Sequence, residues 1–481
     1  MALVAVAQAG SAKASLDVRV DGGIIRGAVE HGVITFKGIL YAAPPVGALR
    51  WAPPQPVKPW KGVRPAVHFG PDCAQLPAPG DDAPLRTAPQ ENCLYINVWR
   101  PKARSRRGLP VMVWIYGGGF VDGGTSPAIY DGTEFARDGV VLVSFNYRLG
   151  NFGFFAFPAL DRAAAGGLRA DYTLMDQIAA LLWVRRHATS FGGDPHNVTI
   201  FGESAGGFSV NALLMSPLAR GLFAQAIIES GGGRDNISPL RPLAGSADSA
   251  EAVGLKLARH LGVQGEGPGA LAQLRAVPAP RLVGGLDMDT EQTDPTFVGG
   301  PVLDSQLYPG GPTKVYAAGG GARVPVMIGA NTDEIGPPQV PRAAGGDQWM
   351  VEPARAVARL LSARGQRVYE YRFDYIATAL RKTLSGAPHA SEIPYVFDTV
   401  AARYGRATSH ADETMARAVH AYWIAFARTV RPEPRGEPAW PRFHPSADEL
   451  MSFTDRGPVA EADPWKQRLD LAERAAERAG H

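Results

Sequence analysis

The first part of the chain alternates apolar and polar residues over short segments that glycine-containing turns separate. These segments lie at residues 16–20, 24–27 and 33–38. Alternation with a period of two is typical of strands with one buried face, and such strands usually pair antiparallel. We therefore expect an antiparallel edge at the N-terminal end of the fold.

The pattern then changes to longer runs in which apolar residues predominate at successive positions. The runs lie at residues 95–99, 111–116, 140–145, 198–202, 226–229, 324–329 and 368–373. Continuous apolar strands are typical of a parallel sheet that is buried on both faces. Helical periodicity lies between several runs, most clearly at residues 174–187, and another helix is expected at 412–429. Strands that alternate with helices predict an α/β fold, with a central, mostly parallel sheet flanked by helices.

Composition narrows the class of protein. Of the 481 residues, 45% are hydrophobic and 20% are charged, which is ordinary for a globular chain. Lys and Arg number 49 against 46 Asp and Glu, so the charge gives no sign of a nucleic-acid partner. No stretch reaches the roughly 18 apolar residues that a membrane span needs. Because there is no internal repeat or long linker, we expect residues 13–481 to form a single domain.

Two features bear on the cellular compartment. Residues 1–12 are mostly small and apolar and contain the pattern Ala7-Gln8-Ala9, which suits either a signal-peptide remnant or a disordered tail. The only two cysteines, Cys73 and Cys93, flank one proline-rich loop and suit a single disulfide; two unrelated buried thiols are the alternative. A disulfide would favour a secreted or periplasmic protein.

The strongest chemical signal is the pentapeptide at residues 202–206, Gly-Glu-Ser-Ala-Gly. An apolar strand leads into it and a helix-compatible stretch follows at residues 208–215, as in a nucleophile elbow. The glycines are needed because bulk two residues either side of Ser204 would collide with neighbouring backbone. The turn also puts Ser204 at the positive end of a helix, which favours an anionic intermediate.

A second signal is the glycine triplet at residues 117–119, directly after a predicted strand. Ester hydrolysis creates an oxyanion, and backbone N–H groups can stabilise it only where no side chain blocks the approach. A flexible turn or a phosphate-binding loop is the alternative. Phosphate binding is disfavoured because no Gly-Lys-Ser/Thr follows, and Asp122 stands where a dinucleotide-binding fingerprint needs its third glycine.

A nucleophilic serine needs an acid and a histidine base, which follow it in that order on this kind of fold. The histidines that follow residue 334 are His389, His410, His420, His444 and His481. His389 stands in a loop after Gly386-Ala-Pro388, where its ring can be presented freely. Asp333 and Glu334 both follow the strand predicted at residues 324–329, and chemistry alone does not choose between these two acids.

Longer motifs point to one family. They lie at residues 36–50, 91–98, 176–177, 191–195, 202–206, 329–334 and 389–397. In these motifs the sequence resembles the type-B carboxylesterase/lipase family, which includes the cholinesterases, over nearly the whole chain. The resemblance implies an α/β-hydrolase fold that cleaves small-molecule carboxylic esters. No cofactor or metal is expected, since His-Glu-x-x-His and Cys-x-x-Cys are both missing.

The resemblance also assigns roles to single residues. The implied reacting groups are Ser204 as nucleophile, Glu334 as acid, His389 as base, and the N–H groups of Gly118, Gly119 and Ala205 as the oxyanion hole. Ser230 matches a position near the triad, and Cys73–Cys93 matches the first disulfide loop of the family. The disulfide loop holds no Trp, so we do not expect choline esters to be preferred.

Some features depart from the family or leave alternatives open. Ile335 replaces the usual glycine after the acid, and the chain is short between residues 336 and 349, where relatives carry helices that wall the substrate gorge. We therefore expect a more open pocket that accepts bulkier esters. A catalytically silent interaction protein on the same fold, or an enzyme for amide or carbamate bonds, is the alternative function. The sequence does not indicate an oligomeric state.

Overall fold

The computed structural model describes residues 15–78, 81–103, 105, 107–164, 167–234, 237–242, 249–303, 306–336 and 342–479. The predicted signal remnant or tail at residues 1–12 lies outside the described residues, and so does His481. Part of the shortened stretch, residues 337–341, also lies outside them.

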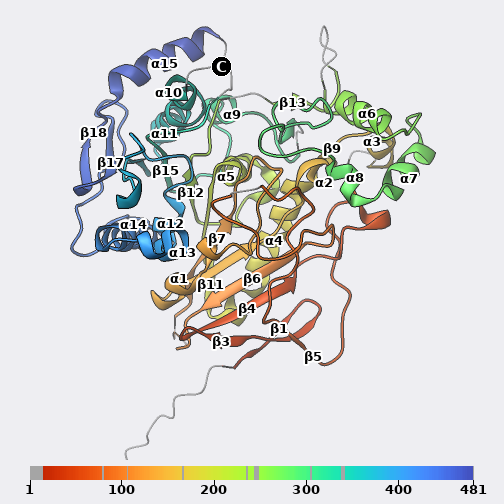
Figure 1. The fold of residues 1–481 in the computed structure, drawn as a ribbon, viewed down its shortest axis with the longest axis horizontal. Coiled ribbons are helices and arrows are strands. Elements are labelled where there is room, and N and C mark those ends of the chain that lie inside the picture. Colours follow the sequence, from red (N-terminus) through yellow and green to blue (C-terminus); the bar gives the residue numbers. More distant parts are fainter. Residues whose placement is uncertain are drawn as a thin grey trace, which may run out of the picture.

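A large sheet crosses the molecule (Figure 1) and takes up eleven of the described strands, in the order β18-β17-β16-β15-β12-β11-β7-β8-β6-β4-β3. The strands are β3 (Ala28–Glu30), β4 (Val33–Leu40), β6 (Tyr95–Arg100), β7 (Leu109–Ile115), β8 (Val141–Phe145), β11 (Gly193–Glu203), β12 (Gln225–Glu229), β15 (Val326–Asn331), β16 (Val368–Phe373), β17 (Glu449–Thr454) and β18 (Gly457–Ala462). From β8 to β17 all neighbours are parallel. The mostly parallel sheet and its antiparallel edge at β3, β4 and β6 are confirmed.

Strand β6 corrects one expectation. The apolar run at residues 95–99 is a strand, but it pairs antiparallel with both β4 and β8, so its expected parallel direction is wrong. The strand is buried along almost its whole length. A strand that is buried on both faces has an apolar sequence whether its neighbours are parallel or antiparallel. The apolar run therefore does not indicate the direction of the strand.

The first two alternating segments form a separate small sheet. Strands β1 (Asp17–Val20) and β2 (Gly23–Arg26) pair antiparallel, and β5 (Val63–Pro65) adds to β2 in parallel. The third alternating segment becomes β4 of the large sheet. The strand predictions for all three segments are confirmed, although only the third belongs to the edge of the main sheet.

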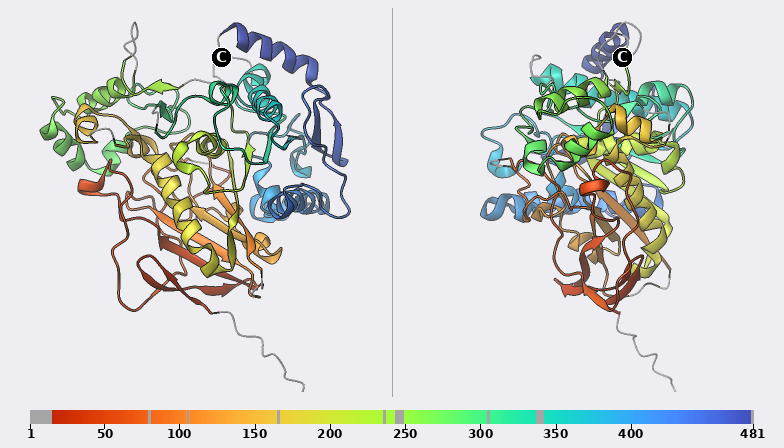
Figure 2. Two further views of the ribbon diagram at one scale, coloured as in Figure 1. Left: turned by 180° about the vertical axis from the view of Figure 1, so that it is seen from behind. Right: turned by 90° about the vertical axis from the view of Figure 1, so that its right-hand side faces the viewer.

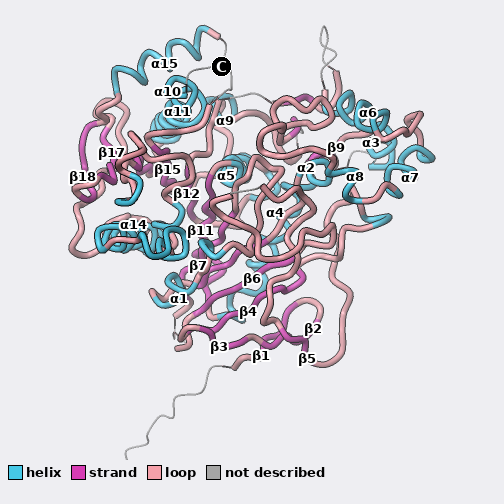
Figure 3. The backbone as a smooth tube through the Cα atoms, viewed as in Figure 1, coloured by secondary structure: helices cyan, strands magenta, loops and turns pink. Residues whose placement is uncertain are grey.

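Helices cover both faces of the large sheet (Figures 2 and 3). On one face lie α4 (Tyr172–His187) and α5 (Ala205–Met215), and on the other lie α1 (Thr133–Arg137) and α14 (His410–Thr429). The two predicted helices, at residues 174–187 and 412–429, are confirmed as α4 and α14. No helix in the described part of the chain is both long and apolar enough to cross a bilayer.

Helix α4 fixes the segments around the sheet's carboxyl edge through buried polar contacts. The carboxylate of Asp176 accepts hydrogen bonds from Nε and Nη2 of Arg148, both at 2.8 Å, and the two side chains are almost fully buried. The neighbouring Gln177 donates to Oγ of Ser209 on α5, at 2.8 Å. Buried charges are tolerated when they are paired in this way, and the paired geometry is specific. Helix α4 is thus tied both to the loop after β8 and to α5.

Cys73 and Cys93 form a disulfide, so the predicted pairing is confirmed. The loop they enclose packs against the glycine-rich turn after β7. Gln75 exchanges hydrogen bonds with the main chain of Gly123, at 2.7 and 2.8 Å. The disulfide that closes this loop therefore also stabilises the glycine-rich turn after β7.

Replacing both cysteines by serine should lower the free energy of unfolding by about 3 kcal/mol, because the unfolded chain regains the entropy of an open loop. The two cysteines are 20 positions apart. Urea unfolding of the wild type and the double variant, followed by tryptophan fluorescence, measures the difference. Equal unfolding midpoints for the two proteins would contradict this prediction.

Candidate active site

Ser204 stands at the sharp turn between β11 and α5. Its φ of 54° and ψ of −123° lie in a region that residues with side chains rarely adopt. A Cβ atom on Gly206 would lie 2.0 Å from the carbonyl oxygen of Ile115, and one on Gly202 would lie 2.5 Å from the same oxygen. The expectation that bulk two residues from the serine would strike backbone is therefore confirmed. The turn puts Ser204 at the N-cap of α5.

The structure brings Glu334 and His389 together. Glu334 follows β15, and its Oε2 is hydrogen-bonded to Nδ1 of His389. Its other oxygen, Oε1, accepts hydrogen bonds from Oγ of Ser230, at 2.5 Å, and from the N–H of Asn331, at 2.8 Å. Of the two acidic residues that sequence chemistry left open, Glu334 is the one whose side chain contacts His389.

Asp333 contributes its main chain instead. Its N–H donates to the carbonyl oxygen of Ala387, at 2.8 Å, and its carbonyl accepts from the N–H of His389, at 3.1 Å. These bonds join the loop after β15 to the loop that carries the histidine. The two loops therefore meet at the carboxyl edge of the sheet, where sites of such folds collect.

The other described histidines that follow Glu334 lie elsewhere. His420 is buried in α14, and its Nδ1 is 2.7 Å from the carbonyl oxygen of Val396. His444 contacts Oγ of Ser446, at 2.8 Å. His410 is largely exposed, and its nearest acidic partner is Glu413. Among the described histidines, His389 is thus the one that contacts the acid after β15.

Glu203, which sequence reasoning did not single out, lies on the other side of the histidine ring. Its Oε1 is 3.2 Å from Nε2 of His389, and its side chain is 3% exposed. Glu203 immediately precedes Ser204, so it links the turn to the histidine loop. The described contacts include no hydrogen bond between His389 and Ser204; such bonds often tighten only when substrate binds. The only available signal was the position of Glu203 next to the serine.

The two carboxylates shift the pKa of the histidine. Burial alone lowers the pKa of His389, but the charges of Glu203 and Glu334 outweigh burial and raise it well above its ordinary value. Burial raises the pKa of Glu203. Burial also acts to raise the pKa of Glu334, but the charge of His389 and three hydrogen bonds lower it below the ordinary value. Glu334 therefore stays ionised while Glu203 is the more easily protonated carboxylate.

The glycine triplet packs against the serine turn. Gly118 and Gly119 have φ of 94° and 57°. The carbonyl of Gly118 accepts hydrogen bonds from the N–H groups of Val121 and Asp122, both at 2.9 Å. A Cβ on Gly117 would lie 2.9 Å from Cβ of Ser204. In the described part of the chain the N–H groups of Gly118 and Gly119 have no acceptor. Ala205 begins α5, so its N–H lacks a partner within the helix.

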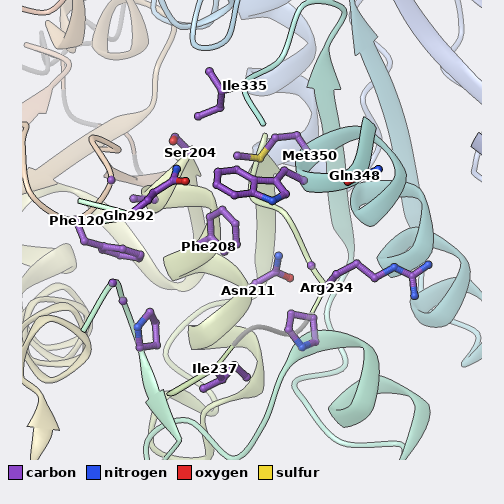
Figure 4. Close-up of a pocket in the computed structure, with 18 of the residues that line it drawn as sticks. Phe120, Ser204, Phe208, Asn211, Arg234, Ile237, Gln292, Ile335, Gln348 and Met350 are labelled. Carbon is purple, nitrogen blue, oxygen red and sulfur yellow. The ribbon is translucent and has the colours of Figure 1, made fainter. Parts of the chain in front are cut away.

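A cavity of about 850 Å³ opens at Ser204 (Figure 4). Its wall includes Gly119, Phe120, Ala205, Phe208, Asn211, Arg234, Ile237, Met288, Glu291, Gln292, Ile335, Gln348, Trp349 and Met350. A mostly apolar wall with a few polar groups is typical of small-molecule sites. Among the described residues, no group of three or more His, Cys, Asp or Glu side chains is arranged to hold a metal ion.

The stretch that sequence analysis marked as shortened still forms part of this wall. Its described part contains α10 (Arg342–Gly346) and a π-helical turn (Asp347–Val351). Gln348, Trp349 and Met350 from this turn line the cavity, together with Ile335. The expectation that the pocket accepts bulky esters stays a prediction.

Comparison with known proteins gives consistent matches over the chain. The sequence matches the family described as "Carboxylesterase family" at residues 14–340 and 342–471. A fumonisin B1 esterase of Sphingopyxis macrogoltabida is 36% identical, over 88% of this chain and 84% of that protein. A para-nitrobenzyl esterase of Bacillus subtilis is 34% identical, over 93% and 96%. A solved structure of PNB esterase has a TM-score of 0.79 at 30% identity, and covers 95% of this chain and 100% of that one.

Replacing Glu203 by Gln should shift the pH dependence of ester hydrolysis. The carboxylate of Glu203 favours protonated His389, whereas a general base must be unprotonated. Removing the charge therefore lowers the pKa of His389, the predicted base, and the acid limb of kcat/KM for p-nitrophenyl acetate should move to lower pH by about one unit or more.

The matched control is Glu229→Gln. Glu229 ends the neighbouring strand β12 and accepts a hydrogen bond from Nε1 of Trp423, at 2.8 Å. Its replacement should leave the acid limb where it is in the wild type. An unchanged limb in Glu203→Gln, measured beside this control, would contradict the assigned effect of Glu203.

Proposed function

The chain belongs to the carboxylesterase family, and from this premise we propose that this carboxylic-ester hydrolase works through Ser204, His389 and Glu334. The observation that carries the proposal is the contact of the Glu334 carboxylate with Nδ1 of His389. It is the arrangement of a base oriented by an acid, next to a serine held on a strained turn. A catalytically silent protein would have no need of it.

In the proposed mechanism, Nε2 of His389 takes the proton of Ser204 while the serine oxygen attacks the ester carbonyl. His389 then protonates the leaving alcohol, and an acyl-enzyme forms on Ser204. Water repeats the cycle in the second half-reaction and releases the acid. Glu334 keeps the proton on Nδ1 and stabilises the imidazolium. It can do so because its lowered pKa keeps the carboxylate ionised.

The N–H groups of Gly118, Gly119 and Ala205 are proposed to hold the oxyanion. The support is their common location beside Ser204 and the unused donors on both glycines among the described residues. Donors fixed before the reaction are effective because they need no rearrangement as charge develops. Each such donor contributes about 10²–10³ in kcat in serine hydrolases.

We further propose that the protein is secreted or periplasmic. The disulfide supports this, because such bonds persist mainly in oxidising compartments. The substrate is proposed to be a small-molecule ester, which the size and apolar wall of the cavity support.

Ser204→Ala should lower kcat for p-nitrophenyl esters by about four to six orders of magnitude, because the attacking oxygen is lost. Glu334→Gln should lower it by about 10³–10⁴-fold, since a neutral amide no longer holds the histidine tautomer. Steady-state kinetics on the folded variants measures both effects.

Asp333→Asn serves as the control for the acid, because it removes the neighbouring carboxylate and keeps the main-chain bonds to the histidine loop. This variant should stay within about tenfold of the wild type. Equal losses in Asp333→Asn and Glu334→Gln would contradict the assignment of Glu334 as the acid.

A series of p-nitrophenyl esters of increasing acyl size tests the predicted accommodation of bulky substrates. With a cavity of about 850 Å³, kcat/KM should remain within about tenfold from acetyl to octanoyl and benzoyl groups. A sharp loss beyond short acyl chains would contradict this prediction.

A further inference from the structure

A carboxylate lies against the glycine turn beside Ser204. The segment at residues 288–292 contributes Met288, Glu291 and Gln292 to the cavity wall. A Cβ on Gly119 would lie 3.0 Å from Oε2 of Glu291 and 3.0 Å from Sδ of Met288. The Glu291 carboxylate therefore packs directly on one of the proposed oxyanion-hole residues. Figure 4 shows its neighbour Gln292 on the side of the cavity where Ser204 and Phe120 lie.

This carboxylate has no cationic partner among the side chains that the structure describes. Its Oε1 accepts a hydrogen bond from Nε2 of Gln292, at a long 3.4 Å. Burial raises the pKa of Glu291 to about 7, and the bond from Gln292 only partly opposes this effect. A half-buried carboxylate without a cationic partner is an unfavourable arrangement unless something else supplies the positive charge.

The cation in the described cavity wall is engaged elsewhere. Arg234 donates from Nε to Oε2 of Glu352, at 3.0 Å, and from Nη2 to Oε1 of the same carboxylate. In Figure 4 its side chain extends away from Ser204. The positive charge of Arg234 is therefore matched by Glu352, and the negative charge of Glu291 is left beside the reacting centre.

An ionised Glu291 opposes the proposed reaction of a neutral ester. The oxyanion would form next to Gly119, close to an existing negative charge, in a cavity where charges are poorly screened. A substrate that carries a positive charge beside its carbonyl would remove this opposition. It would also give Glu291 the partner that the protein does not provide among its described side chains.

We propose that Glu291 is a specificity-determining residue that selects esters with an ammonium group on the acyl half. The inference rests on the proposed function, since it requires that Gly119 holds the oxyanion. The ammonium belongs on the acyl half because the leaving oxygen must face His389, which protonates it, whereas Glu291 contacts the Gly119 side. The substrate class is thus that of aminoacyl-type esters, in which a protonated amine lies a few bonds from the carbonyl.

The test compares matched esters that differ only in charge. Ethyl 3-aminopropanoate and ethyl butanoate have acyl groups of nearly equal size, and 2-(trimethylammonio)ethyl acetate and 3,3-dimethylbutyl acetate place the same difference on the alcohol. A pH-stat at neutral pH follows all four reactions. The wild type should favour the aminoacyl ester over its neutral counterpart by about tenfold or more in kcat/KM, and show no such preference for the charged alcohol.

Glu291→Gln should abolish or reverse the preference, through a loss of about tenfold on the aminoacyl ester and a gain on ethyl butanoate. Asp289→Asn is the matched control, because Asp289 is exposed on the same segment and does not line the cavity. It should leave both rates unchanged. A preference that survives in Glu291→Gln would overturn the proposal.

Failure of this inference is distinguishable from failure of the proposed function. A wild type that hydrolyses p-nitrophenyl acetate through Ser204, yet shows no preference for the aminoacyl ester, overturns the role of Glu291 alone. The wild-type comparison needs no variant, so it decides even if Glu291→Gln does not fold. A wild type that hydrolyses none of the esters overturns both.

Discussion

The close approach of the serine turn to strand β7 is the contact on which the rest of the site depends. The carbonyl oxygen of Ile115 occupies the space that side chains at residues 202 and 206 would need. Because both positions are glycine, the strained turn at Ser204 lies directly against Gly117. The same approach brings the serine turn, where α5 begins, against the glycine turn, in which the N–H groups of Gly118 and Gly119 have no acceptor in the described part of the chain. A methyl group at either glycine would separate the proposed nucleophile from the proposed oxyanion donors.

The electrostatics of the site follow from two buried carboxylates with different surroundings. Glu334 accepts hydrogen bonds from His389, Ser230 and the N–H of Asn331, which keep it ionised. Oε1 of Glu203 is buried and lies 3.2 Å from Nε2 of His389, and burial raises the pKa of Glu203. One carboxylate is therefore suited to orient the histidine, while the other can hold or release a proton as the charge on the ring changes. Glu291 adds a further carboxylate, which packs against Gly119.

Much of this arrangement could be predicted from the sequence, where a local pattern reports on a local structure. The buried strands, the helices at residues 174–187 and 412–429, and the serine turn each have such a pattern. The direction of β6 has no such pattern, because a strand buried on both faces shows the same apolar run in either direction. Local chemistry could not separate Asp333 from Glu334, since the choice depends on which side chain points toward a loop 55 positions away. Glu203 and Glu291 were missed for the same reason: their importance comes from neighbours brought close by folding.

The account predicts that Ser204 becomes covalently acylated during turnover. The most direct test mixes the enzyme rapidly with p-nitrophenyl acetate, quenches with acid before the first turnover is complete, and determines the intact mass and the modified peptide. The expected result is one acetyl group per chain on the peptide that contains Ser204, with a stoichiometric burst of p-nitrophenol. Hydrolysis at the normal rate without any acetylated Ser204, or with the acetyl group on another residue, would contradict the account.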